Sequence, residues 1–174
     1  MKIGINLDKF VYDFKFFDWI KKSKLVELDQ VNCKDDPVRP ELDNKFRTAH
    51  GRKIFGLMDK KEDIEGVACV AFTNEIPSTV KELELMSKEA DLVSAHRAGQ
   101  VGSTAVAYTL WSLKRGAGKK LMRELQKEIK KMPNIKQLVT LSPLTPMATH
   151  YHIRNGAKLI KINTTTQNFE YEIR

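Results

Sequence analysis

The chain has little cysteine and no long hydrophobic run, and each absence excludes a class of protein. Cys33 and Cys69 are the only cysteines among 174 residues, and they lack the C-x-x-C spacing of a zinc site. We therefore expect two reduced thiols, with Cys69 in the core, and no metal. No apolar run approaches the roughly 20 residues that cross a bilayer, and the N-terminal residues mix acids with lysines, unlike a signal or transit peptide. We therefore expect a cytoplasmic protein that is not associated with a membrane.

The chain also lacks a Ser/Gly-rich linker and internal repeats, so one domain over residues 1–174 is expected. Charge is abundant: 30 Lys and Arg stand against 22 Asp and Glu, for a net charge of +8. Such an excess favours an anionic partner, which could be nucleic acid, a membrane surface or a phosphorylated cofactor. Charge alone does not choose among them.

Hydrophobic periodicity predicts an α+β fold, a mixed sheet with helices on both faces. The almost continuous apolar run 104–113 is typical of a central strand covered on both sides. Residues 52–58 and 66–73 suggest an antiparallel hairpin, and 32–44 an irregular connection. Further strands are expected at 135–141, 158–163 and 169–173, helices at 8–22, 78–87 and 143–154, and a glycine loop followed by an amphipathic helix over 114–131.

A small-residue loop precedes the helix that follows the central strand. Gly116, Ala117 and Gly118 stand where that helix begins, so unpaired N–H groups and the positive end of its dipole would face an anion. The spacings of a P-loop and of a dinucleotide-binding fold are both absent. The loop could hold a pyrophosphate or be a solvated basic turn. Its cations are Lys114, Arg115, Lys119, Lys120 and Arg123, with no acid between residues 114 and 123.

Three short motifs follow one another in the order AFTN (71–74), TLSP (140–143) and HIRNGA (152–157). With the strand, G-x-G loop and helix between the first two, they resemble the catalytic domain of malonyl-CoA decarboxylase, a branch of the GNAT superfamily. The resemblance covers residues 46–163, whereas residues 1–45 diverge from the family. It implies a GNAT-like, mostly antiparallel sheet with a splayed central strand pair.

The resemblance also implies an enzyme that converts a malonyl thioester to an acetyl thioester and CO2, a role in fatty acid metabolism, and a coenzyme A thioester as substrate. Malonyl-CoA, another acyl-CoA or a thioester on acyl carrier protein would fit. The segment between TLSP and HIRNGA and the glycine loop are shorter than in the family. The family's helical domain serves in oligomer formation, whereas residues 1–45 precede the matched region here, so the resemblance implies no oligomeric state. The resemblance carries the catalytic pair over to Ser142 and His152. The candidate cofactor-binding residues are those of the loop, Lys114, Arg115, Gly116, Ala117, Gly118, Lys119 and Lys120. Asn74, at a strand end, and Tyr108 are the candidate substrate-binding residues.

Decarboxylation leaves negative charge on the thioester oxygen, so the site must supply hydrogen-bond donors and then a proton for carbon. His152 suits proton delivery because an ordinary imidazole has a pKa of about 6.5. Ser142 would orient the carboxylate or thioester, and the two roles could be exchanged. No acidic third member is identifiable, which disfavours an acyl-serine intermediate.

Other interpretations of the same residues remain open. Ser142 could simply end a strand, and His152 could be a packing residue like the neighbouring His150. An N-acyltransferase of the same superfamily would need a base for its amine, and a non-catalytic basic protein would bind nucleic acid. The lysine cluster lacks interleaved aromatic residues, which disfavours nucleic acid.

Overall fold

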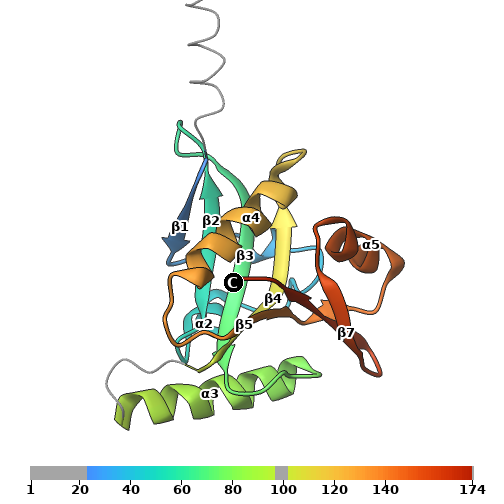
Figure 1. Ribbon diagram of the computed structural model, residues 1–174. Coiled ribbons are helices and arrows are strands. Elements are labelled where there is room, and N and C mark those ends of the chain that lie inside the picture. Colours follow the sequence, from blue (N-terminus) through green and yellow to red (C-terminus); the bar gives the residue numbers. More distant parts are fainter. Residues whose placement is uncertain (1–22, 97–101, 174) are drawn as a thin grey trace, which may run out of the picture.

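The computed structural model describes residues 23–96 and 102–173, and its centre is an eight-stranded sheet (Figure 1). The strand order is β1-β2-β3-β4-β5-β8-β6, and β7 pairs with β8 off this path. The strands are β1 (Lys24–Leu28), β2 (Lys53–Met58), β3 (Ile64–Thr73), β4 (Thr104–Ser112), β5 (Gln137–Thr140), β6 (Ser142–Pro143), β7 (Lys158–Ile162) and β8 (Thr166–Tyr171). The helices are the 3-10 turn η1 (Cys33–Asp35), α2 (Asn44–Thr48), α3 (Val80–His96), α4 (Ala117–Lys130) and α5 (Pro146–Arg154).

The sheet is mixed but mostly antiparallel, as predicted. Every pairing is antiparallel except β4 with β5, which are parallel and are joined through α4. The expected hairpin is β2–β3, and the apolar run 104–113 becomes β4 in the middle of the strand order.

Strand β4 is distorted and loses its second neighbour halfway along its length. Cys69 pairs with Thr109 while Val70 pairs with Ala107, so Tyr108 is an extra residue in a β-bulge. On its other edge β4 pairs with β5 as far as Ala107 and Thr140, and there the two strands separate. This is the splayed central pair that the family resemblance implied.

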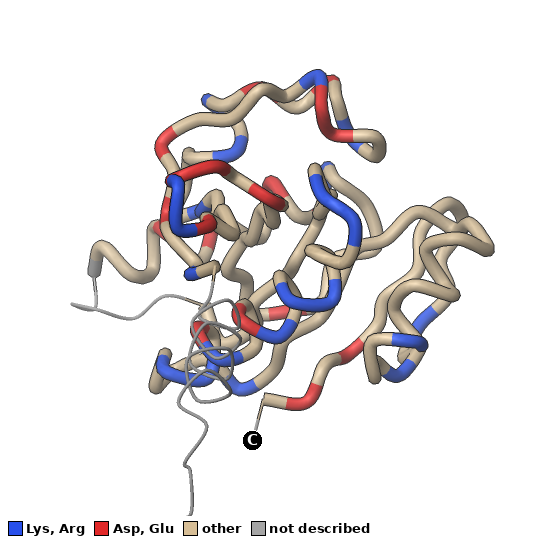
Figure 2. The backbone as a smooth tube through the Cα atoms, turned by 90° about the horizontal axis from the view of Figure 1, so that it is seen from above, with Lys and Arg blue, Asp and Glu red and all other residues tan. Residues whose placement is uncertain are grey.

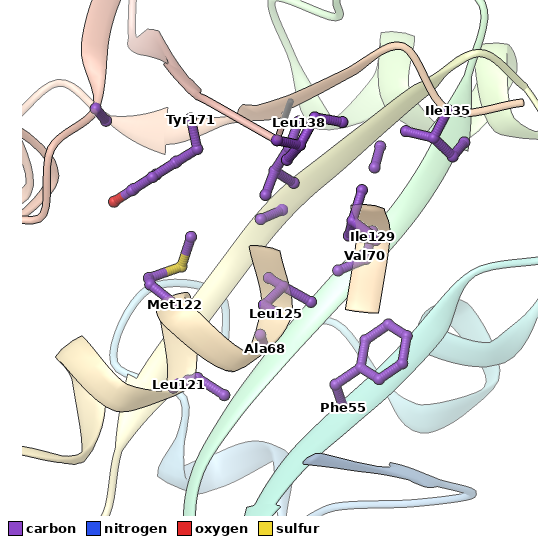
Figure 3. Close-up of a cluster of buried hydrophobic side chains, with 14 of the residues drawn as sticks. Phe55, Ala68, Val70, Leu121, Met122, Leu125, Ile129, Ile135, Leu138 and Tyr171 are labelled. Atoms are coloured by element: carbon purple, nitrogen blue, oxygen red, sulfur yellow. The ribbon is translucent and has the colours of Figure 1, made fainter. Parts of the chain in front are cut away.

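Helices cover both faces of the sheet (Figure 1). The predicted stripe Leu121, Leu125 and Ile129 of α4 is fully buried on one face, in the cluster shown in Figure 3. Leu83 of α3 is buried on the other face, in a second cluster that Phe46 of α2 also contacts. Alternate residues of the strands enter the two clusters because successive strand side chains point to opposite faces.

Several predicted boundaries were wrong. Strand β1 was not anticipated, and α3 continues to His96 rather than ending near residue 87. The helix expected from residue 143 begins at Pro146, because Ser142–Pro143 pairs with β8 and Thr145 caps the helix by accepting a hydrogen bond from the Ala148 N–H. The helix predicted at 8–22 lies outside the described residues. Among those described, none of the helices combines the length and apolar character needed to span a membrane.

Candidate active site

A cavity of about 260 Å³ lies where β4 and β5 separate. Its walls are residues 37–39 of the N-terminal connection, residues 107–112 of β4, residues 141–143 and the inner side of α5. Past Ala107, the β4 edge facing this cavity has no strand partner in the part of the chain that the structure describes. Main-chain groups on that edge therefore lack a strand partner, although the Tyr108 carbonyl accepts a hydrogen bond from Arg39.

Ser142 and His152, the predicted catalytic pair, are brought together in the wall of this cavity. The Ser142 Oγ lies 2.8 Å from the Nε2 of His152. Pairing of Ser142 with Gln167 in β8 fixes the serine, and the last turn of α5 supplies the histidine. Both residues are buried, at 5% and 4% exposure, so the contact is shielded from solvent.

Two further hydroxyl groups, which sequence reasoning missed, extend this contact into a chain. The Tyr171 hydroxyl lies 2.8 Å from the Nδ1 of His152, and the Thr140 Oγ1 lies 3.0 Å from the Ser142 Oγ. Thr140 stands two residues before Ser142, and this period of two could have revealed it. Tyr171 gave no such signal, because the register of the last strand is not readable from the sequence.

Burial lowers the pKa of His152 to about 4. The imidazole is therefore neutral near pH 7, which differs from the expectation that an ordinary pKa would suit it to proton delivery. A neutral imidazole still donates one hydrogen bond and accepts another. His152 can thus polarise a neighbouring hydroxyl or carbonyl without carrying charge.

This pKa makes the stability of the protein depend on pH. Between about pH 6.5 and pH 4 the unfolded chain binds a proton at His152 that the folded chain does not, so stability falls as the pH falls through this window. At pH 5 the loss attributable to His152 should be about 2 kcal/mol. Urea unfolding at pH 7 and pH 5 measures it, with His152→Asn as the control. An equal pH dependence in the two proteins would contradict a buried neutral imidazole.

A buried arginine, Arg39, lines the cavity and connects two segments of its wall. Arg39 donates hydrogen bonds to the carbonyl oxygens of Tyr108 and Leu141, the latter at 3.0 Å, and so bridges the separated strands. It is 6% exposed and lines the cavity. The Asp36 carboxylate fixes its backbone by accepting from the Arg39 N–H at 3.1 Å. Sequence reasoning gave no role to either residue.

The glycine loop lies beside the mouth of the cavity. Gly116 caps α4 with a φ of +81°, which favours glycine. A Cβ on Gly118 would come within 2.9 Å of the Ser112 Oγ and 3.1 Å of the Tyr151 ring, so the helix start packs directly on two cavity residues. The hydroxyl of Tyr151 donates to the Gly118 carbonyl at 2.9 Å.

The cations of the loop are not equally available to an anion. The Lys114 Nζ lies 3.0 Å from Glu65 and 3.5 Å from Asp59, acids that come from β3 and from the β2–β3 turn. Lys120 donates to the Ser23 hydroxyl at 2.8 Å. Arg115 and Lys119 are exposed. Figure 2 shows acidic and basic positions interspersed along the backbone, so acids from other segments offset part of the basic cluster.

The two predicted substrate contacts lie in different places. Tyr108 lines the cavity, and its ring packs edge-on against Phe46 with centroids 6.0 Å apart. Asn74 follows the end of β3 that pairs with the start of β4, whereas the cavity lies along the far half of β4. Its amide oxygen accepts from the Ser103 N–H at 3.4 Å. The structure therefore does not bring Asn74 to the site.

Comparison by sequence finds no relative, because no protein-family profile and no curated protein matches the chain. Comparison with solved structures finds proteins of similar fold. Malonyl-CoA decarboxylase from Rhodopseudomonas palustris matches with a TM-score of 0.64 and 16% identity, over 94% of this chain and 64% of that chain. The corresponding protein from Agrobacterium vitis matches with a TM-score of 0.55 and 20% identity, over 76% of this chain and 36% of that chain.

A shorter structure matches over its whole length. The GNAT-like decarboxylase GphF, solved in complex with isobutyryl-CoA, has a TM-score of 0.63 and 10% identity, over 87% of this chain and 100% of that chain. The present chain spans less than two thirds of either malonyl-CoA decarboxylase chain. At identities of 10–20%, these matches show a likeness of fold. They confirm the fold that the resemblance in the three motifs implied. The chain has the GNAT-like fold that these decarboxylases share.

Proposed function

We propose that this protein decarboxylates a malonyl thioester of coenzyme A, with Ser142 and His152 as the reacting pair. One observation carries the proposal: the two side chains are hydrogen-bonded in the wall of a cavity between splayed strands of a GNAT-like sheet. The similar structure of GphF, with isobutyryl-CoA bound, supports an acyl-CoA as the ligand.

Coenzyme A would run from the start of α4 into the cavity. The start of α4 has no side-chain cap, and although the Ala117 N–H donates to the Lys114 carbonyl at 3.1 Å, the positive end of the helix dipole favours a pyrophosphate there. The exposed Arg115 and Lys119 add positive charge. The pantetheine amides would pair with the part of β4 beyond Tyr108, where β5 is no longer its partner. The thioester would then reach Ser142 and His152.

The charge of the cavity suits an acyl group that carries one carboxylate. Arg39 is the permanently charged residue of the lining, and no Asp or Glu occurs among the described lining residues. An amine acceptor would find neither an anionic partner nor a carboxylate base there. This favours decarboxylation over the N-acyltransferase alternative.

The reaction needs one bond broken and one proton added. The bond between the carboxylate carbon and the α-carbon breaks, CO2 leaves, and the electron pair moves into an enolate whose charge lies on the thioester oxygen. A hydrogen bond from the Ser142 hydroxyl, whose oxygen is in contact with His152, stabilises that charge. The α-carbon then takes a proton from the Ser142 hydroxyl, which solvent reprotonates, and the acetyl thioester is released.

Incubation of the purified protein with malonyl-CoA, followed by mass spectrometry, tests the proposal. Acetyl-CoA that forms without any acceptor supports it. Malonyl-CoA that persists, together with consumption of acetyl-CoA only when an amine is added, would instead indicate an acyltransferase. A malonyl thioester on acyl carrier protein is the second substrate form to test. The cytoplasmic location and a role in fatty acid metabolism stay predictions.

The loop assignment predicts a charge effect on binding. Lys119→Glu and Arg115→Glu should each weaken coenzyme A binding about tenfold at low salt, because a phosphate attraction becomes a repulsion near the helix start. Lys130→Glu, at the exposed far end of the same helix, is the matched control. Isothermal titration at two salt concentrations measures the effect. Equal affinities of the three variants for coenzyme A would mean that its phosphates do not bind at the start of α4.

A further inference from the structure

Four buried side chains form a continuous hydrogen-bonded chain in the order Tyr171, His152, Ser142, Thr140. Tyr171 is rooted in the apolar cluster under α4, and Figure 3 shows its hydroxyl oxygen pointing away from the labelled aliphatic side chains. The ring of His152 stacks on Phe169 at a centroid distance of 4.8 Å, which fixes its orientation. The positions of these side chains leave open which group of each hydrogen-bonded pair is the donor.

In one direction, Ser142 donates to Nε2 of His152 and the Nδ1–H donates to the oxygen of Tyr171. The phenol proton of Tyr171 would then need another acceptor. The hydrogen-bond partner found for this hydroxyl within the described chain is Nδ1 of His152, and the residue is 1% exposed. A buried donor would be left unsatisfied, which is unfavourable.

In the other direction the protons of Tyr171 and His152 both have acceptors. Tyr171 donates to Nδ1, and the Nε2–H of His152 donates to the Ser142 Oγ. The Thr140 Oγ1 accepts from the Phe169 N–H at 3.1 Å and lies 3.0 Å from the Ser142 Oγ. Ser142 can donate to Thr140, or Thr140 can donate to Ser142 when a ligand accepts the serine proton. In that second case Ser142 accepts two hydrogen bonds and donates its own proton to the ligand in the cavity that it lines.

We infer that Tyr171 is a positioning residue that holds His152 in the Nε2–H tautomer and thereby makes the Ser142 hydroxyl the donor that faces the cavity. The raised pKa of Tyr171 agrees with this, because burial keeps the phenol protonated. The role of Ser142 as a donor to the substrate rests on the proposed function, whereas the tautomer of His152 does not.

Nitrogen-15 NMR of the wild-type imidazole tests the tautomer without any substrate. We expect His152 to be protonated at Nε2 and unprotonated at Nδ1 between pH 6 and pH 8, a range set above its pKa of about 4. Tyr171→Phe should produce a tautomer mixture or the Nδ1–H form. Tyr151→Phe is the control, since its hydroxyl donates to Gly118, and it should leave His152 unchanged. An Nδ1–H tautomer in the wild type, which requires no variant to fold, would overturn the inference.

Kinetics separate this inference from the proposed function. Tyr171→Phe should lower kcat for malonyl-CoA about tenfold, the equivalent of one hydrogen bond, with little change in KM. Turnover of malonyl-CoA by a wild type that holds the Nδ1–H tautomer would overturn the inference alone. The Nε2–H tautomer without turnover would support it and overturn the proposed function.

Discussion

Ser142→Ala should slow the release of acetyl-CoA from malonyl-CoA by about 10²-fold or more while coenzyme A binding is retained. The change removes the hydroxyl in contact with His152 and leaves the loop at α4 untouched. Ser112→Ala, the same substitution at the cavity mouth beside Gly118, is the matched control and should stay near the wild-type rate. Assays of acetyl-CoA in samples quenched at successive times measure the rate, and titration with coenzyme A measures the binding.

His152→Asn should have an effect of similar size, because the two side chains act as one hydrogen-bonded unit. The double variant should then be little slower than either single variant. Multiplicative losses would mean that Ser142 and His152 act independently. Wild-type rates in both single variants would remove them from the reaction altogether.

Asp36→Ala should lower the free energy of unfolding by about 3–5 kcal/mol, the largest stability effect we expect. The Asp36 carboxylate lies 2.9 Å from the Nη2 of Arg47, and both side chains are fully buried. It also accepts from the hydroxyl of Thr109 at 2.8 Å and from the Val38 N–H at 2.9 Å. Its removal would leave a buried guanidinium without its counter-charge.

Urea unfolding of Asp36→Ala against Asp35→Ala isolates this effect. Asp35 is an exposed neighbour in η1 and should change stability by less than about 0.5 kcal/mol. Adding Arg47→Met to Asp36→Ala should restore part of the loss, because the stranded charge is removed as well. A loss below about 1 kcal/mol for Asp36→Ala would show that this network does not stabilise the cavity wall.

Periodicity made the middle of the fold predictable from the sequence. The apolar run of β4, the hairpin β2–β3 and the stripe on α4 carry clear patterns, and each became the expected element. Strand β1 carries no such pattern, because its five residues, KLVEL, are short of a strict alternation and none of them is buried. The end of α3 was also missed, since Leu85, Leu92 and Val93 are exposed and blur its apolar face.

The candidate site was predictable only where motif residues carried it. Ser142 and His152 followed from the resemblance, and the structure brings them within 2.8 Å of each other beside the point where β4 and β5 separate. Tyr171 and Arg39 reach the site through long-range packing, with no local pattern to mark them. The acids that pair with Lys114 were hidden for the same reason, because they come from another hairpin.

The most direct test of the whole account is a crystal structure of the Ser142→Ala variant with malonyl-CoA, which this variant should bind but not consume. We expect the phosphates at the start of α4 and the malonyl thioester in the cavity between β4 and β5, with its oxygen within hydrogen-bond distance of His152. An acyl group bound away from His152, or a cavity filled by protein side chains, would contradict the account.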